Sequence, residues 1–344
     1  MSHSRLTPER LKSLIASFPQ ARIAVLGDFF LDKYLTVDAE LAETSVETGK
    51  VAHQVIGMRC SPGAAGTVVG NLAALGAQHL CAIGYTGDDG ESWELRRGLV
   101  RLGCRCDDLA VCEERFTPTY LKPHDSRIAG LPGEHSRYDT KNRQATPPHI
   151  EDAMIAALQG CLPDVDAVIV LDQVDEPECG CVTTRVREAV NMAASRNADI
   201  VFWADSRARI HDFRHVTIKA NEFEAMGIYQ PPPGTCVTDE ELQPHIVRLR
   251  ASNGAPIVVT RADRGVLVSD PDWTVVPAVK VAGPIDSTGA GDSFTAGSVL
   301  ALCAGATLAE AAEVGTLVAS ITIQQLGTTG TASPEQLRNA IATP

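Results

Sequence analysis

The sequence predicts an α/β fold with a mainly parallel central sheet, and three observations support this prediction. Short runs such as residues 22–27 and 166–171 consist largely of Val, Ile, Leu and Ala. Most of these runs are followed by a segment in which apolar residues recur with helical spacing. Strands that are apolar on both faces and alternate with helices are typical of parallel sheets covered on two sides. The 344 residues are also 44% hydrophobic and only 21% charged, which is enough apolar material for a large core.

In the first half of the chain, the sequence predicts five helices and strands and two segments that break the alternation of strands and helices. In chain order we expect a helix over 7–17, a strand over 22–27, a helix over 64–75, a strand over 79–84 and a helix over 91–102. Thr7 can cap the first helix, and Pro8 fits its first turn because no N–H is needed there. Residues 33–60 and 115–140 are more polar and show short alternating runs, so we predict that they form a small β lid.

The second half continues the alternation of strands and helices. We expect a helix over 150–158, a strand over 166–171, a helix over 182–196, strands over 200–204 and 215–219, a short helix ending at 226, a strand over 256–260, and helices over 291–303 and 308–325. We find no linker and no internal repeat, so residues 1–344 are predicted to form one domain. Parallel sheets bind ligands beyond the carboxyl ends of their strands. Those ends carry Asp28, Asp172, Asp205, Lys219–Asn221 and Thr260–Arg261.

Charge and composition exclude several classes of protein. The net charge of −13 argues against a nucleic-acid-binding protein, which would normally be basic. No apolar run reaches the roughly 18 residues of a membrane span. Residues 1–20 lack the apolar segment of a signal peptide, so we expect a cytoplasmic protein with no membrane partner.

The ten cysteines are predicted to be reduced and mostly buried. Two pairs are close in sequence, Cys104 with Cys106 and Cys179 with Cys181. Neither pair forms a CxxC motif, and no paired histidine spacing accompanies them. The sequence therefore indicates no zinc site.

The most informative segment is a glycine-rich turn at the start of a helix. Residues 283–289 are polar and turn-like, whereas the residues after Asp292 have helical spacing, so Gly289-Ala-Gly291 opens a helix. The free N–H groups of such a helix start bind phosphate. A carboxylate at Asp292 would repel that phosphate unless it accepts a proton from an attacking hydroxyl, or it is simply a favourable acidic residue in a first turn. No Lys-Ser/Thr follows, so the motif is not a Walker A sequence.

Residues 286–292 (Asp-Ser-Thr-Gly-Ala-Gly-Asp) resemble the C-terminal signature of the PfkB/ribokinase family of carbohydrate kinases. Residues 62–77 are similar to the N-terminal glycine-rich signature of that family. Segments 27–34, 117–119, 137–139 and 221–225 look most like the D-glycero-β-D-manno-heptose-7-phosphate kinase branch. The resemblance covers roughly residues 20–332 and implies a ribokinase-like three-layer sandwich with a small β lid.

The resemblance also implies roles for individual residues. Asp292 would be the catalytic base, with Gly289, Ala290 and Gly291 forming the anion hole beside it. The residues implied on the sugar side are Asp28, Asp32, Gly63, Thr67, Asn71, Lys122 and Arg137. Those implied on the nucleotide side are Lys219, Glu222, Thr260, Arg261, Asp286, Thr288 and Gly327, with Glu222 also holding Mg²⁺.

Three positions depart from the family pattern. Ala64 replaces the second glycine of the N-terminal signature, and Thr67 replaces an asparagine that usually binds the sugar. The Asn-x-x-Glu motif of the family aligns as Lys219-Ala-Asn-Glu222, which we prefer, or as Asn221-Glu-Phe-Glu224, which restores the letters in a shifted register.

The function implied is phosphoryl transfer from ATP, with Mg²⁺, to a hydroxyl of a sugar or sugar phosphate, for example a heptose 7-phosphate. One alternative is another acceptor, such as a nucleoside. Another is a ligand-binding or regulatory protein with little turnover, which the replacements at Thr67 and Lys219 suggest. The open strands of the lid also make a homodimer through the lid plausible.

Overall fold

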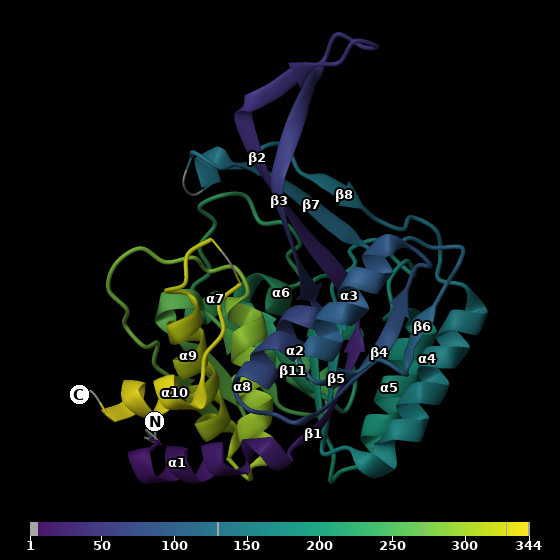
Figure 1. Cartoon of the computed structure of the whole chain (residues 1–344). Helices are drawn as coiled ribbons and strands as arrows, with labels where there is room; N and C mark the ends of the chain where they lie inside the picture. The colour runs from purple at the N-terminus through teal and green to yellow at the C-terminus, as the bar shows by residue number, and fades with distance from the viewer. Residues whose placement is uncertain (1–5, 129–130, 271, 328, 343–344) are drawn as a thin grey trace.

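The computed structural model describes residues 6–128, 131–270, 272–327 and 329–342, and it shows a sheet between two layers of helices (Figure 1). The central sheet has ten strands. They are β1 (Arg22–Gly27), β4 (His79–Thr86), β5 (Cys104–Arg105), β6 (Leu109–Val111), β9 (Ala167–Asp172), β10 (Val201–Ser206), β11 (Thr217–Asn221), β12 (Ile257–Thr260), β13 (Val266–Ser269) and β14 (Trp273–Val276). Their order is β14-β13-β12-β11-β10-β9-β1-β4-β5, with β6 also on β4. The pairs β12–β13 and β13–β14 are antiparallel, and the other pairs are parallel. The expected fold class is confirmed.

The strands divide their side chains between two apolar cores because successive residues point to opposite faces of the sheet. In β1, Ile23 and Val25 join one core, while Ala24 and Leu26 join the other. The first core is covered by α1 (Pro8–Ser17), α2 (Ala65–Ala74), α3 (Gly90–Arg101), α8 (Ala290–Cys303), α9 (Leu308–Thr322) and α10 (Pro334–Ala342). The second is covered by α4 (Pro148–Cys161), α5 (Thr184–Arg196), α6 (Glu222–Met226) and α7 (Asp239–Asn253).

A second, four-stranded sheet stands above the carboxyl ends of the central strands (Figure 1). It contains β2 (Phe29–Thr44), β3 (Val51–Ala64), β7 (Thr119–Asp125) and β8 (Tyr138–Thr140), in the order β3-β2-β7-β8. The expected small β sheet therefore exists, built from the two segments that broke the helical pattern. Residues 129–130 of the second segment lie outside the described residues.

The sequence missed several elements at the end of the sheet that contains β14. Helix α7, the antiparallel strands β13 and β14, and helix α10 were not expected from the pattern. Strands β13 and β14 have only four residues each, which is too short for a clear alternation.

Within the described residues, no helix is both long enough and apolar enough to span a membrane.

Candidate active site

The centre of the candidate site is an ion pair between two neighbouring strands. Asp205 near the end of β10 and Lys219 on β11 are direct partners in the parallel register, so their side chains point to the same face. Nζ of Lys219 donates a hydrogen bond to Oδ2 of Asp205 at 2.7 Å, and both residues are buried. Burial by itself would lower the pKa of Lys219, but the charges of Asp205 and the carboxylates around it raise it. Lys219 is therefore a fixed positive charge.

Helix α8 begins directly above this pair. Gly289 caps the helix with φ +78°, a left-handed conformation that suits glycine. A Cβ on Gly291 would lie 2.8 Å from Nζ of Lys219, so the glycine lets the ammonium group lie against the helix start. The N–H of Ala290 donates to Ser287 O at 3.1 Å, whereas the N–H groups of Gly291 and Asp292 have no acceptor among the described residues. These two N–H groups are thus free to bind an anion.

Asp292 lies in the first turn of α8, among charges of both signs. Burial, followed by the negative charge of Asp205, raises the pKa of Asp292 to about 7. The positive charges of Lys219 and Arg207 oppose this shift, and Asp32 adds to it. A carboxyl group with a pKa near neutrality can accept a proton from a hydroxyl and release it again, as a general base does.

Glu224 is a further carboxylate at this site, and the preferred alignment did not select it. Oε2 of Glu224 accepts the N–H of Asn221 at 2.7 Å in a capping box at the start of α6. Burial and then the charge of Asp205 raise the pKa of Glu224 to about 7, while Lys219 opposes the shift. Glu222, which we expected at this place, forms an ion pair with Arg264 instead.

The charges around Lys219 suit a divalent cation bound together with phosphate groups. Asp205, Glu224 and Asp292 share a single lysine, and the mutual repulsion of the carboxylates contributes to the raised pKa values of Glu224 and Asp292. Mg²⁺ prefers oxygen ligands and usually binds through one or two carboxylates plus phosphate oxygens. Of the two glutamates considered from the sequence, Glu224 is therefore the one whose surroundings fit Mg²⁺.

The lid contributes Asp32 and Lys122, which lie on adjacent strands. Asp32 on β2 and Lys122 on β7 point to the same face, and Nζ of Lys122 donates to Oδ1 of Asp32 at 2.7 Å. The ammonium group also lies 4.9 Å from the ring of Tyr34. A Cβ on Gly63 would lie 2.6 Å from Oδ2 of Asp32, so only glycine leaves room for this carboxylate. Asp32 contributes to the raised pKa of Asp292, so the two carboxylates lie within electrostatic reach of each other.

Two arginines of the lid add positive charge around this space. The guanidinium of Arg137 lies 4.6 Å from the Tyr120 ring and is paired with Asp139 at 2.7 Å. Arg59 lies 4.0 Å from the Tyr34 ring, and its charge has no ion-pair partner within the described residues. Arg137 was expected from the sequence, whereas Arg59 was not, because only the β2–β3 register places it opposite Tyr34.

Arg207 follows β10 directly and was also missed. Its charge lowers the pKa values of both Glu224 and Asp292, which places it within electrostatic reach of both carboxylates. It is exposed, and its guanidinium forms no ion pair or hydrogen bond with any other described residue. The expectation that ligands bind where strands end could have found it, since Arg207 lies two residues beyond Asp205.

Two residues expected to bind the sugar have internal roles. The carboxylate of Asp28 accepts the N–H groups of Gln173, Val174 and Cys181 at 2.6–3.1 Å, so it joins the end of β1 to the loop after β9. Asn71 is 1% exposed and donates to the carbonyl of Thr67, one turn earlier in α2. The carboxylate of Asp28 is thus occupied by internal contacts and Asn71 is buried, and a role for either residue in sugar binding stays a prediction.

Two of the residues expected on the nucleotide side, Arg261 and Thr260, also form internal contacts. Arg261 is buried and binds both carboxylate oxygens of Asp239 at 2.7 and 2.8 Å, which fixes the loop after β12 to α7. The hydroxyl of Thr260 donates to Ala220 O at 3.4 Å. These two side chains hold strand ends in place, and the structure shows no contact from them to the helix start.

Asp286 connects the turn before α8 to the late loop. It accepts the N–H of Thr288 at 3.0 Å and the N–H of Gly327 at 3.1 Å, and the hydrogen bonds from Thr288 lower its pKa. Thr67 lies beside the same turn, with its methyl carbon 3.6 Å from a Cβ placed on Gly289. The structure therefore brings Thr67, Asp286, Thr288 and Gly327 to the start of α8. Thr328, which follows Gly327 in the same loop, lies outside the described residues.

A separate pocket lies away from the candidate site. It has a volume of about 830 Å³ and is lined by residues such as Arg22, His79, Arg105 and Cys161. Arg22 and His79 are the first residues of β1 and β4, so this pocket is at the opposite end of the strands from Asp292. It contains none of the expected site residues.

The chain is also similar in sequence to known proteins. The family described as pfkB family carbohydrate kinase matches residues 21–336. The chain is 28% identical over 324 residues to the Bifunctional protein HldE of Shewanella amazonensis, covering 92% of this chain and 63% of that protein. It is 29% identical over 339 residues to the protein of that name from Coxiella burnetii, covering 95% and 65%. The chain thus spans slightly less than two thirds of the length of these curated relatives.

Solved structures share the fold. A ribokinase from Thermotoga maritima superposes with a TM-score of 0.66 at 19% identity, covering 94% of this chain and all of that chain (100%). The phosphofructokinase-2 of Escherichia coli, solved with fructose-6-phosphate, gives a TM-score of 0.65 at 16% identity and covers 94% and 98%. The ribokinase of Arabidopsis thaliana, solved with ribose and ATP, gives 0.66 at 15% identity and covers 94% and 99%.

Proposed function

Because the chain belongs to the pfkB family of carbohydrate kinases, we propose that it transfers the terminal phosphoryl group of ATP to a hydroxyl of a phosphorylated sugar. The observation that carries the proposal is the position of Asp292. Its carboxyl group, with a pKa of about 7, stands beside two free N–H groups and within electrostatic reach of Asp32 of the lid. A proton acceptor, an anion site and a ligand for sugar hydroxyls thus surround one space.

In the proposed reaction Asp292 removes the proton from the attacking hydroxyl. The O–H bond breaks, the oxygen forms a bond to phosphorus, and the bond from that phosphorus to the bridging oxygen of ADP breaks. The N–H groups of Gly291 and Asp292 bind the oxygens of the transferred group, and the charge of Lys219 lies beside them. Fixed charges of this kind stabilise the negative charge that develops in the transition state.

Mg²⁺ bound to the ATP phosphates would neutralise part of their charge during transfer. Glu224 and Asp205 are the residues we propose to hold it, directly or through water. Asp205 also fixes Lys219, so the same carboxylate positions both positive charges.

The positive charges of Lys122, Arg59, Arg137 and Arg207 favour an acceptor that carries a phosphate of its own. Arginine and lysine bind phosphate through charge-assisted hydrogen bonds. The relatives named HldE and the resemblance to heptose-7-phosphate kinases favour a heptose 7-phosphate among such acceptors. A nucleoside without phosphate would leave these charges unused.

A screen of ADP release tests the proposal. Candidate acceptors would be sugar phosphates, the matching free sugars and nucleosides, each with and without Mg²⁺. We expect turnover to require a phosphorylated sugar. Calorimetric binding of ATP and sugar phosphate without ADP release would instead favour the regulatory alternative.

We also propose that two copies of the chain associate through the lid. Strand β3 is an edge of the small sheet, and the β2–β3 hairpin exposes apolar side chains. They are Leu41, Val46, Val51, Val55, Ile56 and Met58. Light scattering should give a dimer for the wild type and a monomer for Val55→Asp combined with Met58→Glu. A monomeric wild type would contradict this proposal.

A further inference from the structure

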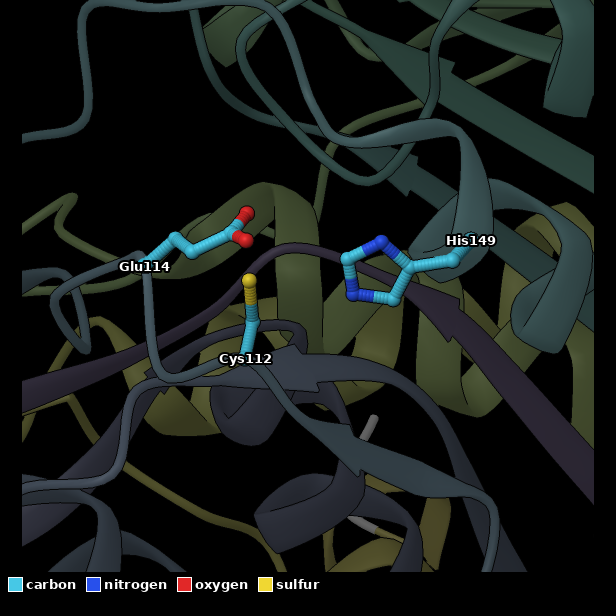
Figure 2. A group of neighbouring side chains, drawn as sticks. All are labelled: Cys112, Glu114 and His149. Carbon is cyan, nitrogen blue, oxygen red and sulfur yellow. The ribbon is translucent and has the colours of Figure 1, made fainter.

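A cluster of three potential metal ligands lies at the root of the lid, outside the candidate active site. Cys112 and Glu114 belong to the loop between β6 and β7, and His149 is the second residue of α4. The chain enters the lid after Glu114 and has left it before His149. Figure 2 shows the sulfur of Cys112 directed toward the space between the Glu114 carboxylate and the His149 ring. The three residues therefore bracket the lid segment.

The distances are close to those of a bound metal ion. One ligand atom from each residue lies within 4.8 Å of the other two. In a tetrahedral zinc site with bonds of about 2.0–2.3 Å, ligand atoms are roughly 3.3–3.8 Å apart. Glu114 and His149 are exposed, so rotation of their side chains can close this difference while the backbone stays in place.

The backbone on both sides of the cluster is held by other contacts. The N–H of Cys112 donates to Thr86 O at 2.8 Å, which fixes Cys112 to the end of β4. Arg115 donates to the carbonyls of Gln144 and Ala145, and so links the chain that enters the lid to the chain that leaves it. Because the ligands lie on connected segments, little chain entropy would be lost on binding an ion.

The two exposed ligands are available. Within the described part of the chain, neither the Glu114 carboxylate nor the His149 ring forms a hydrogen bond or an ion pair. The Cys112 side chain is 1% exposed, so the ion would sit at the surface with the sulfur beneath it. The cluster thus has donors without partners on the solvent side and a fixed thiol on the protein side.

The donor set indicates which ion would bind. Thiolate, imidazole and carboxylate together suit Zn²⁺, whereas Mg²⁺ and Ca²⁺ prefer oxygen ligands alone. We propose that Cys112, Glu114 and His149 form a Zn²⁺ site that joins the root of the lid to α4, with water as the fourth ligand. On binding, the S–H bond of Cys112 breaks, its proton goes to solvent, and the sulfur forms a bond to the ion. Neither an oxidant nor a reductant is needed.

The consequence is a lid whose base is tied to the core by a metal as well as by hydrogen bonds. Lys122 and Arg137 lie on the segment between the two halves of the cluster. A bound ion stabilises the folded state that holds it, and it would restrict the motion of this segment. The site is independent of the proposed kinase reaction, because none of its ligands belongs to the site around Asp292.

The test measures metal binding directly. Protein treated with a chelator is titrated with Zn²⁺ by calorimetry, and with Co²⁺ while the absorption spectrum is recorded. We expect one Zn²⁺ per chain with a low-micromolar or tighter Kd and a thiolate-to-cobalt charge-transfer band. Cys112→Ser should abolish that band. Both Cys112→Ser and His149→Ala should weaken Zn²⁺ binding at least ~10²-fold, because even changes outside the ligand set cost about 10–100-fold.

Matched controls separate this site from adventitious binding. Glu113→Gln removes a neighbouring charge, and Cys236→Ser removes an exposed thiol elsewhere, so both should bind Zn²⁺ like the wild type. His149→Ala changes only a surface side chain, and it keeps the test valid if Cys112→Ser disturbs folding. A wild type that binds no Zn²⁺, or equal affinities in all variants, would overturn the proposal. Neither result would bear on the kinase reaction.

Discussion

Lys219 lies between Asp205 and Gly291, and this contact places a buried positive charge at the start of α8. The hydrogen bond to Asp205 is 2.7 Å long, and a Cβ on Gly291 would lie only 2.8 Å from the same Nζ. The positive charge of Lys219 has a consequence for the carboxyl group in the first turn of α8. It partly offsets the raised pKa of Asp292.

Asp292→Asn should lower kcat by at least ~10²-fold, because the amide cannot accept the proton of the attacking hydroxyl. ADP release at saturating ATP measures this effect. Asp272→Asn, an exposed change in a different part of the chain, is the matched control and should keep wild-type kcat. Near-normal turnover in Asp292→Asn would remove Asp292 from the role of base.

The same substitution should stabilise the fold at high pH. The pKa of Asp292 is raised from 3.8 to about 7, so ionisation costs folding free energy as the pH rises from 3.8 through 7. Above pH 7 the asparagine variant should therefore be more stable, on the order of 1–3 kcal/mol by urea unfolding. Near pH 3.8 the two proteins should unfold alike. Equal stability at all pH values would show that the ionised carboxylate of Asp292 does not destabilise the fold.

The pH profile of kcat/KM should report the pKa of Asp292 in the free enzyme. We expect activity to rise with pH and to level off above an inflection near pH 7, since the base acts when deprotonated. Asp205→Asn removes the largest charge that raises this pKa, so the inflection should move to lower pH. An unchanged inflection in Asp205→Asn would assign it to another group.

Arg207→Ala should raise KM for the sugar phosphate about 10-fold or more, because a charge-assisted hydrogen bond contributes roughly 1.5–3 kcal/mol. Steady-state kinetics should show no such change for the matching free sugar, which lacks the phosphate. Arg101→Ala removes an exposed arginine at the end of α3 and serves as the control. A change in KM for ATP alone would place Arg207 on the nucleotide instead.

Asp28→Ala should affect folding rather than substrate binding. It leaves two buried N–H groups and one partly buried N–H group without an acceptor, and each buried one costs about 1–3 kcal/mol. We expect a clear fall in Tm, measured by calorimetry, and an unchanged KM for the sugar in the protein that folds. A normal Tm with a raised KM would restore Asp28 as a sugar ligand.

Sequence patterns were sufficient for the central elements of the fold. Apolar runs alternating with helices specified the parallel sheet, because local periodicity reflects burial on both faces. The glycine turn at 289–291 could likewise be identified from the order of polar and apolar residues. The short strands β13 and β14 could not, since four residues carry too little pattern.

The assignment of single side chains depended on tertiary structure. Asp28 and Asp32 are both acidic and four residues apart, yet only the fold shows that one accepts buried N–H groups and the other pairs with Lys122. The choice between Glu222 and Glu224 was also decided by position, since one pairs with Arg264 and the other lies near Asp205.

By itself, the sequence determined the family, the sheet and the helix start that carries Asp292. Only the tertiary structure decided which charges surround that residue, and it alone brought Cys112, Glu114 and His149 together across 37 positions of the chain. The physical reason is that hydrophobic periodicity is a local property of the chain. Electrostatic and metal-binding interactions instead depend on distances between segments that only folding brings close.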